Sequence, residues 1–408
     1  MRIKQSLSLG FGTLVAVVTP EEEGVGEGLS FCNLLTLLLL RSYFTSQKLD
    51  FYTMGEQEEI QTVTAFDVNE NIEHFLHDLK KGNLKNTLEI ACETVRLLER
   101  MITNCEWTSA KDLMSLIRTN GKKLTDPPTI HIVVGSMVKR VLKVIRDEYS
   151  SALGKSDEYD QQESLQKMLV AEEDMDFTKD ISSLGKSISA NLRELIEEFE
   201  RSPQDIALQS EEHVHSDDVI MTFGHSRTVE RFLKKAASKR KIHVIVAEAF
   251  PSCSGRTMAK NLAESNISTS FITDDATSAF MKMVKKVIVG THSVMANGGL
   301  KARIGIHSVA LSAKRHNVPL IVLAPTFKLT PQYVTSSDQE GFQHFGPPEE
   351  VLPFNDDRLF KDAIVLNPYF DYVKPELVTL LIFNTSGNAP SYVYRLLSEL
   401  YHPDDHEL

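Results

Sequence analysis

Between about residue 69 and residue 201, apolar side chains recur every three or four positions, which is the spacing of amphipathic α-helices. Gly82 and Gly121 each follow such a stripe and predict a helix end, because glycine tolerates the left-handed backbone that closes many helices. Ser109 and Asp112 resemble a capping box before the apolar residues 113–117. We therefore expect a helical domain, which we place at residues 54–205.

After Ser202 and Pro203 the pattern changes to short β-branched runs that alternate with amphipathic segments. The predicted strands are residues 219–222, 242–247, 268–272, 286–289, 320–324 and 378–383. The predicted helices between them are residues 227–238, 254–265, 276–283 and 301–316. Continuous apolar strands separated by helices indicate a mainly parallel, doubly wound sheet in an α/β domain at residues 206–408. Such sheets bind ligands at the carboxyl ends of their strands, beside the switch point.

A final helix is predicted at residues 388–401, where Asn388 and Pro390 suit a helix start. Four of its residues fall on one apolar face: Tyr392, Leu396, Leu397 and Leu400. A terminal helix with such a face must bury it on its own sheet or on another subunit, so we expect these residues to support assembly. We expect the polar residues 402–408 to contribute far less.

The first 53 residues differ in composition from the rest of the chain. Their longest apolar run, residues 29–40, is shorter than the ~20 residues that span a bilayer. The preceding segment lacks a clear signal-peptide cleavage site. We interpret residues 1–53 as a disordered leader or an artefact of the gene model, with Met54 as the working start.

The formal net charge of -12 excludes a global basic field that would attract nucleic acid or an anionic membrane. We therefore expect proteins or small molecules as partners, with neither direct nucleic-acid nor membrane binding. The four cysteines lie far apart without CxxC spacing, which fits neither a disulfide framework nor a zinc site. This usage indicates a reducing compartment.

The segment after the first predicted strand, Gly224 to Thr228, opens a helix. Free amides at a helix start, together with Ser226 and Arg227, would make an anion site. The alternative is an ordinary Ser226 N-cap beside a solvated Arg227. A dinucleotide site requires the pattern GxGxxG, of which only Gly224 is present, so we expect no cofactor.

A second loop, residues 290–299, follows the fourth predicted strand. Asn297 and Gly298 permit positive φ and a close backbone approach to a ligand, although a tight turn from strand to helix would use the same residues. Two clusters, at residues 213–218 and 402–406, contain histidine and aspartate. Neither has helical i,i+4 spacing, so we interpret them as solvated loops and expect no metal site.

Several of these segments resemble the family that unites the alpha, beta and delta subunits of translation initiation factor 2B with certain sugar-phosphate isomerases. The shared motifs are VIVG at residues 287–290, ANG at 296–298 and APTFK at 324–328. Residues 160–165, 220–230, 242–248 and 387–405 are most similar to the beta-subunit branch. The resemblance covers about residues 69–408 and implies a helical domain followed by a Rossmann-like domain.

In the isomerase members, a cysteine after the first strand and an aspartate in a Gly-Ala-Asp loop act on the sugar phosphate. The matching positions here are Gly224 and His292. Glycine has no side chain and histidine is no carboxylate, so the resemblance implies that this chemistry is absent. Asn297 and Gly298 are retained, and we expect the crevice to persist as a shape.

The resemblance further implies a non-catalytic, regulatory subunit of the complex that recharges translation initiation factor 2 with GTP. Its alpha, beta and delta subunits detect the phosphorylated alpha subunit of that factor, and its epsilon subunit carries exchange catalysis. The expected partners are the alpha, gamma, delta and epsilon subunits and factor 2 itself, in the cytosol. Two alternatives stay open: a phosphosugar isomerase with different catalytic residues, and a sugar-phosphate sensor that uses Ser226 and Arg227.

Overall fold

A computed structural model describes residues 67–84, 86–125, 131–153, 177–179, 181, 183–333, 344–353 and 364–405. The predicted leader at residues 1–53, the motif at residues 160–165 and His406 lie outside these ranges. The described residues belong to one compact unit that begins at Phe66. No helix among them is both long and apolar enough to cross a bilayer.

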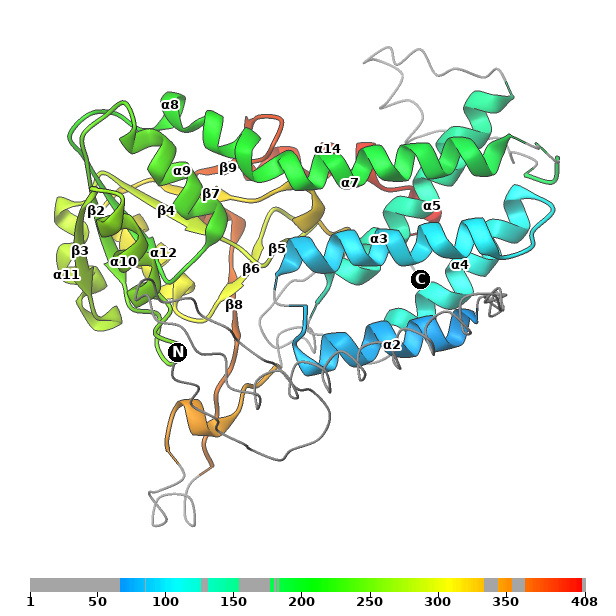
Figure 1. Cartoon of the computed structure of the whole chain (residues 1–408). Helices are drawn as coiled ribbons and strands as arrows, with labels where there is room; N and C mark the ends of the chain where they lie inside the picture. Colours follow the sequence, from blue (N-terminus) through cyan, green and yellow to red (C-terminus); the bar gives the residue numbers. More distant parts are fainter. Residues whose placement is uncertain are drawn as a thin grey trace, which may run out of the picture. The chain divides into compact units, whose positions relative to one another are not determined.

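The N-terminal part of this unit is helical, as predicted (Figure 1). Its helices are α2 (Val68–Lys81), α3 (Thr87–Asn104), α4 (Ala110–Thr125), α5 (Val133–Ala152), α7 (Leu184–Leu208) and α8 (Ser210–His213). Gly82 ends α2 with φ of 70°, as its position indicated. The capping box before α4 is also confirmed, because Asp112 N donates to Ser109 Oγ (3.2 Å) and Ser109 N donates to Asp112 Oδ2 (3.2 Å).

Gly121 does not end a helix, and that prediction was wrong. It lies inside α4 and is buried against α5. A Cβ atom at residue 121 would lie 2.5 Å from Val138 Cγ1, closer than two carbon atoms can approach. Glycine is therefore present because the two helices pack tightly at this point, a reason that the local sequence does not reveal.

Helix α7 continues through the predicted domain boundary at residue 205 and contains Pro203 in its interior. Proline has no N–H group, so it leaves the carbonyl oxygen four residues earlier without its helical partner. The Ser202 hydroxyl donates to that oxygen, on Phe199, at 2.7 Å. This bond replaces the missing helical partner, and α7 continues to the short helix α8, which precedes the first strand.

The rest of the chain forms the predicted α/β fold around a seven-stranded sheet of order β10-β9-β7-β4-β1-β2-β3. Its strands are β1 (Asp218–Phe223), β2 (Ile242–Ala247), β3 (Ser268–Ile272), β4 (Lys286–Gly290), β7 (Leu320–Leu323), β9 (Leu380–Ile382) and β10 (Gly387–Asn388). All neighbours pair in parallel except β10, which is antiparallel to β9. The chain therefore builds outward from β1 in both directions, and the switch point lies between β1 and β4.

Alternate residues of each strand serve two separate cores, as a sheet covered on both faces requires. Ile220 packs with α9 (Arg227–Ala237) and α10 (Gly255–Glu264). Its neighbour Met221 packs with α12 (Ile306–Arg315) and α14 (Val393–Leu400) on the opposite face. The predicted doubly wound architecture is thereby confirmed.

The predicted helix at residues 301–316 begins too early. Lys301 belongs to β6 (Leu300–Arg303), which pairs with β5 (Ser293–Val294) and β8 (Phe370–Val373) in a small antiparallel sheet. Helix α12 starts only after Gly305, whose amide donates to the Asp371 carboxylate at 2.7 Å. This acceptor is 66 residues away in sequence, so the start of α12 is set by tertiary structure.

Two other predicted helices are shorter than expected. Residues 276–283 consist of one helical turn, α11 (Thr277–Phe280), between two 3₁₀ turns. The final helix α14 begins at Val393 after a 3₁₀ turn and ends at Leu400. Val393 and Tyr401, the residue after the helix, are fully buried, and the predicted face omitted both. Leu397 is also buried, whereas Leu396 and Leu400 are partly buried against the same core and Tyr392 is partly exposed.

The polar C-terminal segment is only partly solvated: Pro403 and Asp404 are exposed, as we expected, but Asp405 is not. Its Asp405 side chain is fully buried and forms ion pairs with Arg118 of α4 at 2.6 Å and Arg146 of α5 at 3.2 Å. The short 3₁₀ turn at Pro403–Asp405 is thus attached to the helical part of the fold. The polar composition of residues 402–408 suggested exposure, and it gave no sign of the buried ion pairs of Asp405.

Candidate functional site

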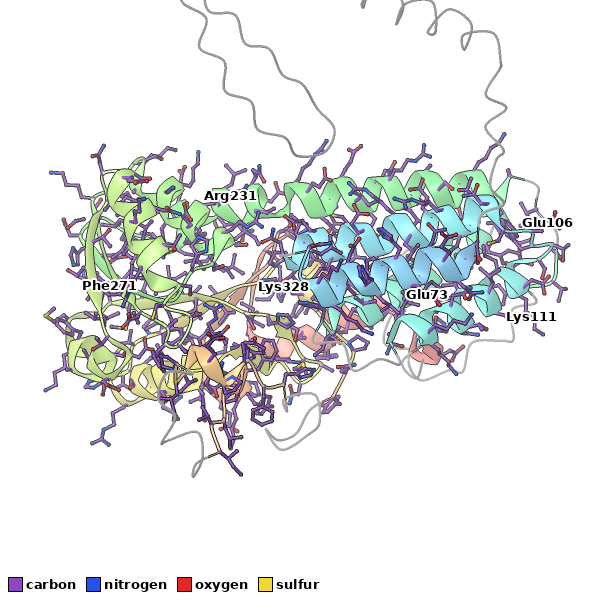
Figure 2. All side chains as sticks on the ribbon, turned by 60° about the horizontal axis from the view of Figure 1, so that its bottom comes forward. Glu73, Glu106, Lys111, Arg231, Phe271 and Lys328 are labelled. Atoms are coloured by element: carbon purple, nitrogen blue, oxygen red, sulfur yellow. The ribbon has the colours of Figure 1, made fainter. Side chains whose placement is uncertain are left out.

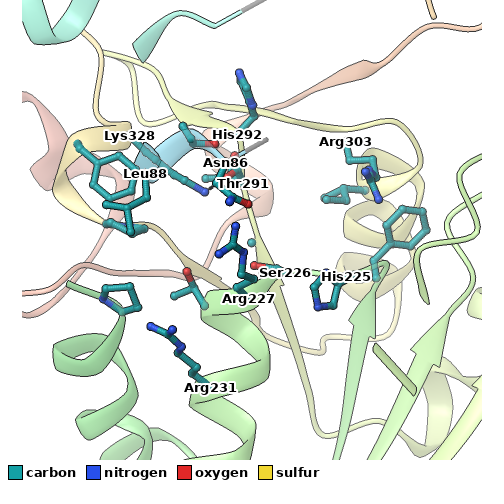
Figure 3. A pocket seen from close by; sticks show the side chains of 18 of the residues that line it. Asn86, Leu88, His225, Ser226, Arg227, Arg231, Thr291, His292, Arg303 and Lys328 are labelled. Carbon is teal, nitrogen blue, oxygen red and sulfur yellow. Dashed lines mark hydrogen bonds between the residues drawn. The ribbon is translucent and has the colours of Figure 1, made fainter. Parts of the chain in front are cut away.

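A cavity of about 420 Å³ lies at the carboxyl ends of β1 and β4, at the switch point of the sheet (Figure 3). The loop after β1 contributes His225 and Ser226, the start of α9 contributes Arg227, and the loop after β4 contributes Thr291 and His292. The loop after β7 adds Pro325, Phe327 and Lys328. The helical part closes the cavity with Asn86, Thr87, Leu88 and Pro203.

Four basic side chains line this cavity: Arg227, Arg231, Arg303 and Lys328. None of the described residues in its lining is an aspartate or a glutamate. Arg227 and Lys328 extend toward each other in Figure 3, while Figure 2 shows Lys328 where the helical part meets the α/β part. The nearest carboxylate paired with Arg227 is Glu89, at 3.4 Å, and both side chains are about half exposed. The cavity is therefore strongly positive and suited to an anion.

Two helices begin at the wall of the cavity. Helix α9 starts after Ser226 and α3 starts after Asn86, and neither side chain caps its own helix. The first amides of each helix thus remain available to a bound anion, and both helix dipoles favour negative charge at this end. The two helix starts come from different parts of the fold and add to the field of the four basic side chains.

Lys328 is partly buried and donates from Nζ to the Thr291 carbonyl oxygen at 2.7 Å. Burial lowers its pKa to about 8, because the charged amine is poorly hydrated there. An anion beside the amine would favour the protonated form and reverse this shift. Protonation of the Lys328 amine and binding of an anion in the cavity should therefore favour each other.

His225 is held by a carboxylate that lies outside the cavity lining. Its Nε2 atom is 2.9 Å from Glu230 Oε2, and Glu230 also accepts hydrogen bonds from Lys234 (2.7 Å) and Asn261 (3.1 Å). Burial alone would raise the pKa of Glu230, but these hydrogen bonds lower it overall. Glu230 is consequently ionised and fixes the orientation of the His225 ring.

The structure brings some of the predicted site residues together and separates others. Ser226 and Arg227 line the cavity, as does His292, whose ring centroid is 4.7 Å from that of Phe370. Gly224 has φ of 62° and lies just behind the lining, where a Cβ atom would be 3.3 Å from Arg303 Nη1. The same atom would lie closer still to Ala249 Cβ (3.0 Å) and Ser254 Oγ (3.1 Å), so a cysteine at this position would be crowded.

Asn297 and Gly298 do not line the cavity. Asn297 Oδ1 accepts from Gly299 N and its Nδ2 donates to the Tyr372 hydroxyl, both at 2.8 Å. Gly298 has φ of 77°, and a Cβ atom there would lie 2.6 Å from the Pro390 carbonyl oxygen. Both residues shape the turn between β5 and β6, and that turn joins two strands rather than a strand and a helix.

The sequence-based prediction missed Arg231, Arg303, Lys328 and the start of α3. Arg231 could have been found, because it follows Arg227 by four positions and so shares its helix face. Lys328 belongs to the APTFK motif, but nothing local places its amine near Thr291. Arg303 was assigned to a helix, and Asn86 carries no signal that relates it to a sheet more than 130 residues away.

The two histidine–aspartate clusters are largely explained by ion pairs. In the first, the buried Asp218 accepts from Lys286 at 2.8 Å, so it is not solvated as we expected. Burial tends to raise the pKa of Asp218, yet its bonds to Lys286 and to the His215 amide lower it overall. Among the described residues, no three side chains of histidine, cysteine, aspartate or glutamate are arranged to hold a metal ion.

Comparison with known sequences reveals close relatives over most of the chain. The profile of the Initiation factor 2 subunit family matches residues 85–390. A translation initiation factor eIF2B subunit beta from Dictyostelium discoideum is 37% identical, over 82% of this chain and 95% of that protein. A ribose 1,5-bisphosphate isomerase from Pyrococcus furiosus is 34% identical, but over only 52% of this chain and 65% of the isomerase.

Solved structures show the same fold. The crystal structure of eIF2B beta from Chaetomium thermophilum is 25% identical, with a TM-score of 0.66 over 84% of this chain and 95% of that one. A chain of the tetrameric eIF2B-beta2-delta2 complex from the same organism is 23% identical, with a TM-score of 0.61 over 82% of this chain and 96% of that one.

Proposed function

The chain belongs to the Initiation factor 2 subunit family, and from this membership we propose that it is a regulatory, non-catalytic subunit of the guanine-nucleotide exchange factor for translation initiation factor 2. The observation that carries the proposal is the 37% identity to an eIF2B subunit beta along 95% of that relative. The sequence motifs at residues 220–230, 242–248 and 387–405 support the same branch. We propose the cytosol as its location.

The proposed partners are the other subunits of the exchange factor and factor 2 itself. A relative with the same fold occurs in a complex of two beta and two delta subunits, which supports a delta-type subunit as the first neighbour. In this role the chain would contribute to assembly and to sensing of the phosphorylated alpha subunit of factor 2. Exchange catalysis would belong to another subunit.

Affinity purification of the tagged chain from its own cells tests this proposal. We expect the remaining exchange-factor subunits to co-elute, because a regulatory subunit acts only within the complex. We also expect the complex to accelerate GDP release from factor 2, and the isolated chain to have no such activity. Recovery of the chain as a monomer without these subunits would contradict the proposal.

The isolated chain should not isomerise ribose 1,5-bisphosphate. This chain has Gly224 beside the cavity and His292 in its lining, at the positions where the isomerase members carry a cysteine and an aspartate, so the two reacting side chains are missing. We expect product formation to equal a no-enzyme control, measured by ³¹P NMR at pH 7 with the purified protein. Turnover above that control would support the isomerase alternative, with the His225–Glu230 pair as the first residues to replace.

A second function is favoured by the cavity itself, namely binding of a sugar phosphate or a similar phosphate ester. Four basic side chains and two helix starts face a cavity whose described lining contains no acid. We propose that the chain retains a ligand site at the switch point as a sensor while lacking the isomerase reagents. Ribose 5-phosphate is a suitable probe because its phosphate and hydroxyl groups match this lining.

Replacing Lys328 with methionine should weaken ribose 5-phosphate binding about 10- to 150-fold, since a hydrogen bond to a charged group contributes about 1.5–3 kcal/mol. For the unaltered chain, affinity should fall as the pH rises through about 8, because the Lys328 amine then loses its proton. The variant should lack this pH dependence. Calorimetric titrations between pH 7 and 9.5 measure both effects.

Two controls accompany this measurement. Lys282 is an exposed lysine remote from the cavity lining, and its replacement by methionine should leave binding unchanged. The pKa of Lys328 is lower in the fold than its ordinary value of 10.5, so at pH 7 the buried charge opposes folding and its removal should not lower the melting temperature. Equal binding by the Lys328 variant and the unaltered chain would contradict the proposed anion site.

A further inference from the structure

The C-terminal residues connect the two parts of the fold. Lys143 of α5 donates to the Ser398 carbonyl oxygen (3.3 Å), near the end of α14. Beyond this point, the Asp405 carboxylate accepts from Arg118 of α4 (2.6 Å) and from Arg146 of α5 (3.2 Å). The fully buried Asp405 side chain thus pairs with arginines of the helical part. The preceding helix, α14, packs into the core of the α/β part.

The same segment reaches the wall of the cavity. Tyr401 is 1% exposed, and its hydroxyl donates to the Leu329 carbonyl oxygen at 2.7 Å. Leu329 directly follows Lys328, whose amine lies at Thr291 in the cavity. The residue before Lys328, Phe327, inserts into the core of the helical part, with its ring centroid 5.5 Å from that of Phe199.

We propose that residues 401–405, which we call the C-terminal latch, position residues 326–329 and so hold Lys328 where the cavity binds an anion. The inference rests on the anion site proposed above. Three consecutive residues, Phe327 to Leu329, carry these three contacts, and adjacent Cα atoms are about 3.8 Å apart, so a shift at Leu329 moves the backbone of Lys328. Because linkage is reciprocal, anion binding should in turn tighten the latch.

The latch is also linked to the wall of the cavity that the start of α3 forms. Arg146 belongs to α5, which packs with α3, and Arg118 belongs to α4, which packs with α5. The start of α3, Asn86 to Leu88, lines the cavity. Asp405 therefore attaches to the part of the fold that supplies one helix start, and Tyr401 attaches to the loop that supplies Lys328. Release of the latch would loosen both walls together.

Tyr401→Phe tests the proposal, because it removes the hydroxyl and keeps the buried ring. Tyr394→Phe is the matched control, since Tyr394 lies on the helix that Tyr401 follows and is 60% exposed. In the full chain without ligand, we expect Tyr401→Phe to accelerate hydrogen exchange of the amides of Lys328 and Leu329. We also expect it to weaken ribose 5-phosphate binding by about 2- to 30-fold, the range found for residues that couple sites without touching the ligand.

The reciprocal measurement uses the unaltered chain. Saturating ribose 5-phosphate should slow exchange of the Tyr401 and Asp405 amides, which donate to Leu397 O and His402 O. If the unaltered chain binds ribose 5-phosphate and Tyr401→Phe changes neither exchange at residues 328–329 nor affinity, the latch proposal is wrong. If the unaltered chain does not bind ribose 5-phosphate, the proposed anion site is wrong. The proposed effect of the latch on ligand binding is then wrong as well.

Discussion

Replacement of Asp405 by alanine should lower the free energy of unfolding by about 3–5 kcal/mol, the usual cost of removing one partner from a buried ion pair. The Asp405 side chain is fully buried, and Arg146 is 11% exposed, so the substitution would leave the Arg146 guanidinium with only the exposed carboxylate of Asp404. Deletion of residues 402–408 should cost at least as much. This reverses our expectation that the polar tail contributes little.

Urea denaturation followed by circular dichroism measures this effect. Asp404→Ala is the matched control, because Asp404 is 67% exposed and lies 3.7 Å from the same Arg146. An exposed ion pair of this kind contributes about 0–1 kcal/mol, so the control should unfold almost like the unaltered chain. Equal stabilities for the two variants would mean that the buried contact at Asp405 does not stabilise the fold.

Replacement of Leu397 by aspartate should destabilise the α/β part by about 4 kcal/mol or more, because an unpaired carboxylate would enter an apolar core. Leu397 is 6% exposed and packs with side chains of the β-strands and of α12, on the face of the sheet that Met221 faces. The exposed side of the same helix provides the control, Tyr394→Asp. We expect the control to keep its melting temperature, measured by calorimetry.

The same pair of variants separates folding from assembly. If α14 serves only its own domain, Leu397→Asp should lose the other subunits because it unfolds, and Tyr394→Asp should retain them. Loss of co-purifying subunits by a stably folded Tyr394→Asp variant would instead show that the outer face of α14 contacts a neighbour. An unchanged melting temperature of Leu397→Asp would contradict the packing described above.

Much of the fold could be predicted from the spacing of apolar residues, because buried positions recur every three or four residues in a helix and every second residue in a strand with one buried face. The β-branched runs at 242–247 and 268–272 coincide with β2 and β3, residue for residue. The capping box at Ser109 and Asp112 and the glycine at residue 82 were also predicted, since these contacts are local. The loops at the ends of β1 and β4 were located from the strand pattern, because each follows an apolar run directly.

The failures share one physical cause, which is that the deciding contact lies far away in sequence. Gly121 is required by Val138 on another helix, and α12 begins where it does because of Asp371. Lys301 reads as helical but is a buried strand residue whose pKa burial lowers to about 8. No window of neighbouring residues contains these partners.

The sequence by itself determined the two-part architecture, the direction of the sheet and the family, because each depends on patterns repeated along the chain. Only the tertiary structure decided which residues form the site and which fasten the C terminus. Of the four cations of the cavity, Arg227 and Arg231 lie on the predicted helix α9, whereas Arg303 ends β6 and Lys328 follows β7. Asp405 looked like a solvated acid until the fold placed Arg118 and Arg146 beside it, because burial and charge pairing are properties of neighbours in space.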